Sequence, residues 1–390
     1  MRDLFINSST QHTLLLIVPF VFAALLRLAR SPAPAMLGGI VGGILLGPAV
    51  LGHLDPGMWD KVFTGGIEER AALETTMRRQ EADVRAATAV GVDASVLSLM
   101  RAEHAVAIEQ AKADVNAAQW HDQRPLRSYG MTLVALALFV GARRRTSAGT
   151  ATPGTAASVG MWASLLPGGI VAACAFWFWD ASPPIAVAAG ACLAAGPWTL
   201  ATWERATADR AEEGGASLML RCGRVAWIVA SCAGLLAGWR IMGASAIVWL
   251  APLAALPLGW CLAPTRRKWI NSAIDWIVLP SMVTCSIVLI NPMDAVQFWP
   301  ILIILLLSGD GRWLGGMIGL LALGGRDQQR SMALAMPLVD AGVSQVCMVV
   351  LLGAIGALTP SLTIAIVFGG LMLEISAPWR RRFAFAVTPP

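Results

Sequence analysis

Long apolar runs dominate the chain, and most of them match the length of a helix that crosses a bilayer. A hydrocarbon core needs roughly 20 predominantly apolar residues in helical conformation. We count about eleven such runs and predict a transmembrane helix for each, at 12–30, 35–52, 129–142, 158–178, 184–203, 217–239, 243–262, 269–290, 298–320, 332–357 and 361–378. The pattern therefore predicts an all-α membrane protein whose surroundings are the lipid bilayer.

One stretch departs from this pattern, because residues 64–127 are rich in the helix formers Ala, Glu, Arg and Gln. Residues 90–93 interrupt the stretch near its middle, which suggests two antiparallel helices in a short coiled hairpin. The apolar residues at loose helical spacing are Ile67, Leu73, Met77, Val84, Val96, Met100, Ile108 and Val115. Two roles fit this hairpin equally well: a solvated spacer near the membrane, or a docking surface for a protein partner or a second protomer.

Composition supports the membrane assignment and narrows the chemistry. Of the 390 residues 56% are hydrophobic and only 14% are charged, whereas soluble domains carry about 25% charged residues. The Cys and His residues are scattered, with no metal-ligand spacing, and no phosphate-binding glycine motif is present. We expect no metal, no cofactor, no nucleic-acid partner and no enzymatic activity.

Basic residues give the topology a direction. If the spans alternate, the odd-numbered connections and the carboxyl terminus share one side of the membrane. That side collects Arg27, Arg30, Arg143, Arg144, Arg145, Arg205, Arg210, Arg221, Arg224, Arg266, Arg267, Lys268, Arg326, Arg330, Arg380, Arg381 and Arg382. Cytoplasmic loops are the ones enriched in Lys and Arg. We therefore expect a bacterial plasma (cytoplasmic) membrane, with the amino terminus outside and the carboxyl terminus in the cytoplasm.

The apolar runs and the helix-rich insertion divide the chain into three parts, and the orientation places the insertion outside the cell. Residues 1–63 hold the first two membrane helices, and residues 64–127 form an extracytoplasmic insertion between the second and third spans. Residues 128–390 hold the remaining membrane helices, about nine in number.

Two helix breaks stand inside apolar runs. Gly196 and Pro197 interrupt the fifth run in PPIAVAAGACLAAGPWTLATWERA, and Pro337 and Gly342 interrupt the tenth in MPLVDAGVSQVCMVV. Proline removes a backbone donor and glycine adds backbone freedom. In secondary transporters, broken helices meet at the midplane and bind substrate or ion through freed N–H and C=O groups. Breaks five spans apart are consistent with two inverted repeats plus one extra helix.

Among the charged residues in apolar runs, three are candidates for a functional role: Asp310 and Arg312 in LLLSGDGRWLGGMIG, and Asp340 in the tenth run. A charge at the bilayer centre costs roughly 2.5–3.5 kcal/mol on insertion scales, so these residues are candidates for ion or proton coupling. The alternative is structural: Arg312 could fasten two spans by bonding Asp340, Asp310 or free backbone carbonyls.

These motifs, in this order, resemble the monovalent cation:proton antiporters of the sodium/hydrogen exchanger superfamily. GGIVGGILLGPAVLG resembles that family's glycine-rich second helix, and IDWIVLPSMVTCSIVLINPMD is similar to its proline-containing helix. The two interrupted runs resemble its two crossing helices. GRWLGG resembles its G-K-x-x-G motif, with Arg312 at the place of the membrane lysine. The similarity covers nearly the whole chain outside 60–128 and implies two discontinuous crossing helices.

The resemblance also implies where an ion-binding acid would stand. In the family this acid lies on the span after the first crossing helix, and the matching positions here fall near Ala230, Ser231 and Cys232. That span contains no carboxylate at all. Small apolar residues also replace the polar ones of the first crossing helix. Asp340 is then the strongest remaining titratable candidate.

The broken helices together with this resemblance imply a secondary transporter that exchanges a monovalent cation for H⁺ by alternating access, working as a homodimer. Asp340 and Asp310 are the coupling candidates. A second hypothesis is a transport-inactive descendant, a membrane scaffold that binds a protein partner through the 64–127 hairpin. A passive channel, or a transporter for another small solute, is the third.

Overall fold

The protein is described from a computed structural model, which places residues 2–143, 153–194, 236, 240, 252, 255, 272–321 and 342–387. This described part is helical and holds no strand. Its main helices are α1 (Arg2–Leu28), α2 (Pro34–Leu46), α3 (Leu51–Leu54), α4 (Pro56–Trp59), α5 (Ile67–Ala89), α6 (Ala94–Asp122), α7 (Arg124–Arg143), α8 (Pro153–Phe178), α9 (Pro183–Ala194), α15 (Leu279–Ile287), α16 (Pro292–Ala295), α17 (Phe298–Leu306), α18 (Arg312–Leu321), α20 (Gly342–Ala354) and α21 (Pro360–Val387). Three π-helical turns join them: η1 (Asp60–Thr64), η4 (Ile274–Val278) and η5 (Leu307–Gly311).

Three helical segments of the described part are long and apolar enough to cross a membrane: Ser9–Leu28, Pro34–Leu54 and Phe298–Gly319. Five of the other predicted spans coincide with shorter apolar helices: Leu165–Phe178, Pro183–Ala194, Ile274–Ile287, Gln345–Ala354 and Pro360–Ser376. The predicted spans at 217–239 and 243–262 lie almost entirely outside the described residues. An all-helical protein with apolar, membrane-length helices is thus the part of the fold prediction that the structure bears out.

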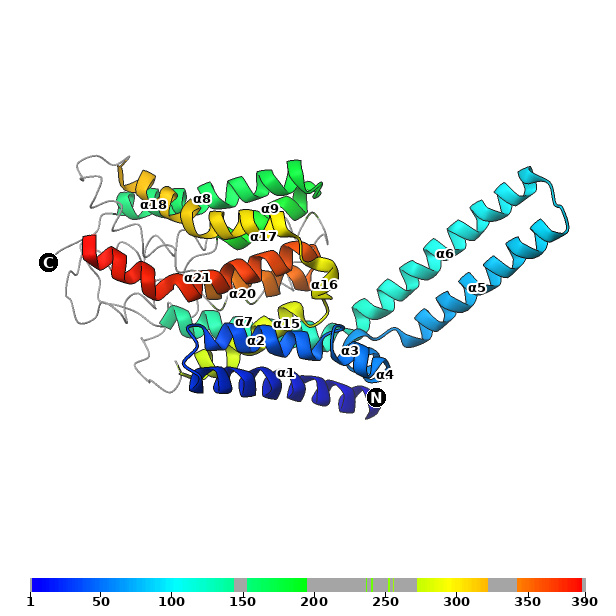
Figure 1. Ribbon diagram of the computed structural model, residues 1–390, viewed down its shortest axis with the longest axis horizontal. Coiled ribbons are helices and arrows are strands. Elements are labelled where there is room, and N and C mark those ends of the chain that lie inside the picture. Colours follow the sequence, from blue (N-terminus) through cyan, green and yellow to red (C-terminus); the bar gives the residue numbers. More distant parts are fainter. Residues whose placement is uncertain are drawn as a thin grey trace.

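The apolar helices form one bundle in which α20 and α21 lie centrally. Figure 1 shows α8, α9, α17 and α18 on one side of this pair and α1, α2, α7 and α15 on the other. Helix packing agrees, since α21 contacts α17, and α20 contacts α7, α9 and α15. Side chains from both groups share a single buried core with α20 and α21.

Glycines let several of these helices approach to backbone contact. A Cβ added at Gly190 of α9 would lie 2.5 Å from the carbonyl oxygen of Gly168 in α8, and one added at Gly168 would lie 2.9 Å from that of Gly190. Gly39 in α2 faces the Pro280 carbonyl of α15 in the same way. Without a hydrophobic driving force between helices in lipid, such close approach is a main source of association.

The 64–127 stretch is a hairpin of two antiparallel helices, α5 and α6, which projects away from the bundle (Figure 1). The chain reverses over residues 90–93, where Gly91 has a φ of +74°. Five of its eight predicted apolar residues are buried or half-buried, as expected for a coiled hairpin: Leu73, Val84, Met100, Ile108 and Val115. The other three, Ile67, Met77 and Val96, are exposed.

The hairpin and the amino terminus lie at one end of the bundle, and the last helix, α21, ends at the other (Figure 1). Helix α6 continues almost directly into α7, because only Gln123 separates them. The hairpin is therefore a rod-like extension of one of the bundle helices.

Candidate functional site

Arg312 is the buried charge of the described bundle. It begins α18 directly after the π-helical turn η5, which the glycine-containing segment LSGDG forms. Its residue surface is only 2% exposed, and its guanidinium donates a hydrogen bond from Nη2 to the backbone carbonyl of Leu193 in α9. π-helical turns inside longer helices are frequent at functional sites. A backbone carbonyl was one of the partners weighed from the sequence.

The carbonyl that Arg312 contacts has a particular place in the sequence. In an α-helix the carbonyl of residue 193 would accept from the N–H of residue 197, four positions later. Residue 197 is a proline, which has no N–H to give. Arg312 supplies a donor to this oxygen, for which the sequence has no N–H four residues later.

Asp310 lies two residues before Arg312 but is placed differently. It falls in the π-helical turn η5 and is exposed at the surface of the bundle, whereas Arg312 points inward. The described structure gives no ion pair between them. The two residues that the sequence places together in one apolar run therefore occupy different environments.

Several candidate residues lie outside the described residues. They are Gly196, Pro197, Ser231, Cys232, Pro337 and Asp340. Gly342 is described as the first residue of α20, the helix that follows the second predicted break. The described parts of the two predicted crossing helices, α9 and α20, pack against each other.

Sequence reasoning passed over one polar residue in this region, Gln345 of α20. It is 0% exposed, and neither its Nε2 nor its Oε1 has a hydrogen-bond partner among the described residues. The available signal was a single amide in the apolar stretch VSQVCMVV. A search for intramembrane charges does not flag an uncharged side chain.

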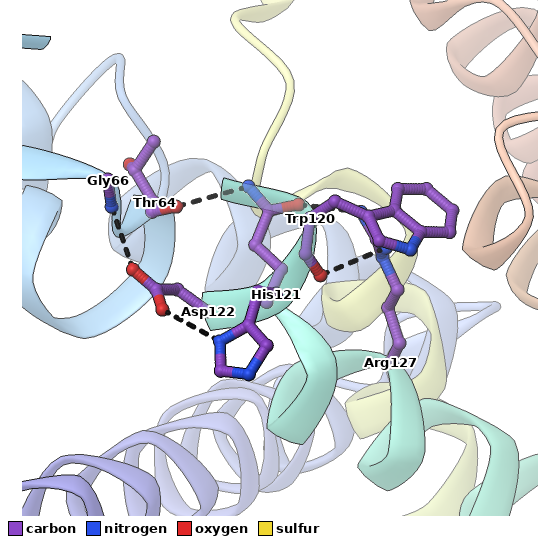
Figure 2. Close-up of polar contacts among 7 residues, drawn as sticks. Thr64, Gly66, Trp120, His121, Asp122 and Arg127 are labelled. Atoms are coloured by element: carbon purple, nitrogen blue, oxygen red, sulfur yellow. Dashed lines mark hydrogen bonds and ion pairs between the residues drawn. The ribbon is translucent and has the colours of Figure 1, made fainter. Parts of the chain in front are cut away.

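A second polar cluster joins the hairpin to the bundle (Figure 2). Asp122, the last residue of α6, accepts a hydrogen bond from the Gly66 backbone N–H at 2.8 Å. Next to it, the Gln123 side-chain amide donates to the Thr64 carbonyl at 3.3 Å. The start of α5 and the end of α6 are therefore tied to each other at the root of the hairpin.

Arg127 completes this root. Its guanidinium carbon lies 3.2 Å from the centre of the Trp120 ring, and it donates to the Gln123 side-chain oxygen at 3.0 Å. Burial lowers the pKa of Arg127 to about 10, so the group stays charged at neutral pH and keeps its cation–π contact. An ion pair, Arg70 with Asp60 at 2.6 Å, also joins α5 to η1.

Comparison with known proteins leaves the chain without an assigned family. No family model matches it, and no curated protein matches it. Within the described residues, no group of three or more His, Cys, Asp or Glu side chains could hold a metal ion. The resemblance to antiporters therefore rests on the motifs of the sequence alone.

Proposed function

We propose that the protein is a secondary transporter of the plasma membrane, which exchanges a monovalent cation for H⁺ by alternating access. The observation that supports this most is the buried guanidinium of Arg312 at the Leu193 carbonyl. Burying a charged group and a backbone carbonyl without its helical donor in an apolar bundle costs free energy. Such a cost is typical of a binding or transport site. Secondary transporters build their sites from such interrupted helices.

In this proposal Arg312 has an electrostatic role. Its guanidinium does not give up its proton in practice, so it cannot carry the transported proton itself. It holds the first crossing helix at Leu193 and provides a fixed positive charge beside the transport route. The proton carrier is then Asp340, whose carboxyl lies in the tenth apolar run, with Asp310 as a second acid nearer the surface.

The complete transporter would have about eleven spans in two inverted repeats, with the hairpin outside and the carboxyl terminus in the cytoplasm. The placement of the amino terminus and the hairpin at one end of the bundle is consistent with this topology. We further propose that the protein works as a homodimer.

A reconstitution experiment tests the proposal. Purified protein in liposomes is loaded with a pH-sensitive dye, and Na⁺, K⁺ or Li⁺ is added outside. The proposal predicts a rise of internal pH with at least one cation, because H⁺ leaves as the cation enters, and loss of this signal in Asp340→Asn. No pH change with any of the three cations would contradict it.

A second function has its own support in the hairpin. Its root is held by side-chain and backbone hydrogen bonds, while α6 exposes Leu99 and Val106 at 64% and 68%. A braced rod with exposed apolar residues is suited to binding another protein. If the protein is a transport-inactive scaffold, deletion of 66–122 should abolish capture of a partner while the membrane bundle remains folded.

A further inference from the structure

The side chain of Gln345 is enclosed by the bundle on every side. The residue is 0% exposed, and so are the three residues that follow it, Val346, Cys347 and Met348. Its helix, α20, packs against α7, α9, α15 and α21. Neither bulk water nor a lipid headgroup can therefore satisfy the amide in this conformation.

A second buried glutamine shows what a structural amide looks like in this protein. Gln11 of α1 is 3% exposed, and its Nε2 donates to the Val62 carbonyl at 2.9 Å. Gln345 is at least as buried but has neither its donor nor its acceptor used within the described residues. Buried polar groups in native proteins are nearly always hydrogen-bonded, and exceptions call for water, an ion or a functional role.

Other unpaired side chains in the bundle carry a weaker signal. Ser308, for example, is also fully buried without a partner among the described residues, but it has a single small hydroxyl. A glutamine presents a carbonyl oxygen and two N–H groups. An apolar side chain of similar volume would fill the position of Gln345 without that unsatisfied potential.

The position of Gln345 connects it to the arginine site. Its helix contacts α9, whose Leu193 carbonyl accepts from Arg312. In the sequence it follows Asp340, the acid proposed to carry the proton, by five residues. The unpaired amide of Gln345 thus lies on α20, the helix that begins at the second predicted break.

We propose that Gln345 binds the transported cation, with its Oε1 as a ligand to a monovalent ion that has shed part of its water. This inference rests on the proposed function. Neutral oxygen ligands such as carbonyl groups replace the hydration shell of monovalent cations in membrane proteins. Because a carboxamide does not titrate, Gln345 would select the ion while Asp340 exchanges the proton.

Cation-dependent thermal unfolding of the full-length protein in detergent tests this site without requiring transport. Wild type, Q345M and the matched control Q11M are measured in LiCl, NaCl and KCl against choline chloride of equal ionic strength. We expect wild type and Q11M to gain Tm with at least one small cation. In Q345M, an unbranched replacement, the half-saturating concentration should rise about tenfold or more, as for loss of a ligand to a charged group.

Two results would overturn the inference: a cation response in Q345M equal to that of wild type, or no cation-specific Tm shift in wild type. Q345L provides a second apolar replacement, and its own unfolding transition reports whether it is folded. Liposome assays separate this site from the proposed function. If Q345M exchanges cation for H⁺ with the cation affinity of wild type, the proposed cation site is wrong and the proposed transport function stands. If cation binding depends on Gln345 but no exchange occurs, the cation site stands and the transport function is wrong.

Discussion

Arg312 of α18 donates a hydrogen bond to the backbone carbonyl of Leu193 in α9, and the sequence has a proline, Pro197, at the position whose N–H would be the helical donor to this carbonyl. The two helices are joined by a contact between residues 119 positions apart. A long side chain on one helix thus donates to a backbone carbonyl on another. In a bilayer this matters more than in water, because no solvent can serve the oxygen.

The first prediction concerns this hydrogen bond. Replacement of Pro197 by Ala restores an N–H four residues after Leu193, which is the local donor that an α-helix through these residues gives to this carbonyl. Arg312→Met should then cost about 1 kcal/mol less in the Pro197→Ala background than in wild type, within the 1–3 kcal/mol assigned to an unsatisfied buried group. Thermal unfolding of the four proteins of the double-mutant cycle in detergent measures the coupling.

Pro19, which lies inside α1, provides the control for that cycle. Its replacement by Ala likewise restores a helical N–H, but in α1 and not in α9, whose Leu193 carbonyl accepts from Arg312. The effects of Pro19→Ala and Arg312→Met should add within about 0.5 kcal/mol. An equally large coupling for Pro19 and Pro197 would show that the link between Arg312 and Pro197 is not specific.

The second prediction concerns the root of the hairpin. Gly65 and Gly91 both have positive φ, +68° and +74°. A Cβ at Gly65 would collide with the Asp122 side chain, whereas a Cβ at Gly91 meets nothing within 4 Å. Gly91→Ala should therefore cost only the roughly 1–2 kcal/mol of a left-handed conformation, and Gly65→Ala should cost more.

Hydrogen exchange of the full-length protein distinguishes the two variants. Gly65→Ala displaces Asp122 from the Gly66 N–H, so exchange should accelerate on both sides of the root, near 64–70 and 119–127. Gly91→Ala should accelerate exchange only at the tip. Equal exchange at the root in both variants would mean that the contact with Asp122 does not brace the hairpin.

The third prediction concerns the contact between α8 and α9. Gly190→Ala would place a methyl group 2.5 Å from a backbone oxygen that cannot rotate away, and should destabilise the bundle by about 1–3 kcal/mol. Gly169, one residue beyond the glycine in contact with Gly190, has open space around it. Gly169→Ala should be neutral or stabilising by about 0.5–1 kcal/mol, because alanine favours the helix. Tm values in detergent compare the pair, and a similar loss in both would rule out backbone contact as the cause.

The helical hairpin illustrates what a sequence pattern can and cannot specify. Helix-forming composition and an interruption at 90–93 predicted two antiparallel helices, and the structure confirms them. The apolar list was less exact, since Met77 and Val96 are exposed while Val115 is buried. Two helices alone bury only one narrow stripe on each, so a residue a fraction of a turn away stays in solvent.

For the buried polar residues, too, the sequence predicts one part and only the fold shows the rest. An arginine in an apolar run signals its own burial, because the charge is costly there, and Arg312 is indeed buried. Its partner could not be deduced, since any freed carbonyl on a neighbouring helix would serve and only the fold brings Leu193 within reach. Gln345 carries no charge, so the sequence does not indicate that its amide is buried without a hydrogen-bond partner among the described residues. Only the fold shows this.

Uptake of a labelled cation driven by a pH gradient tests the central claim most directly. Liposomes containing the wild-type protein, acidic inside, are diluted into alkaline medium with radioactive Na⁺ or Rb⁺. The proposed exchange predicts accumulation of one of these ions, abolished by Asp340→Asn and by collapse of the pH gradient with an ionophore. Uptake no greater than in protein-free liposomes, for either ion and at every gradient imposed, would contradict it.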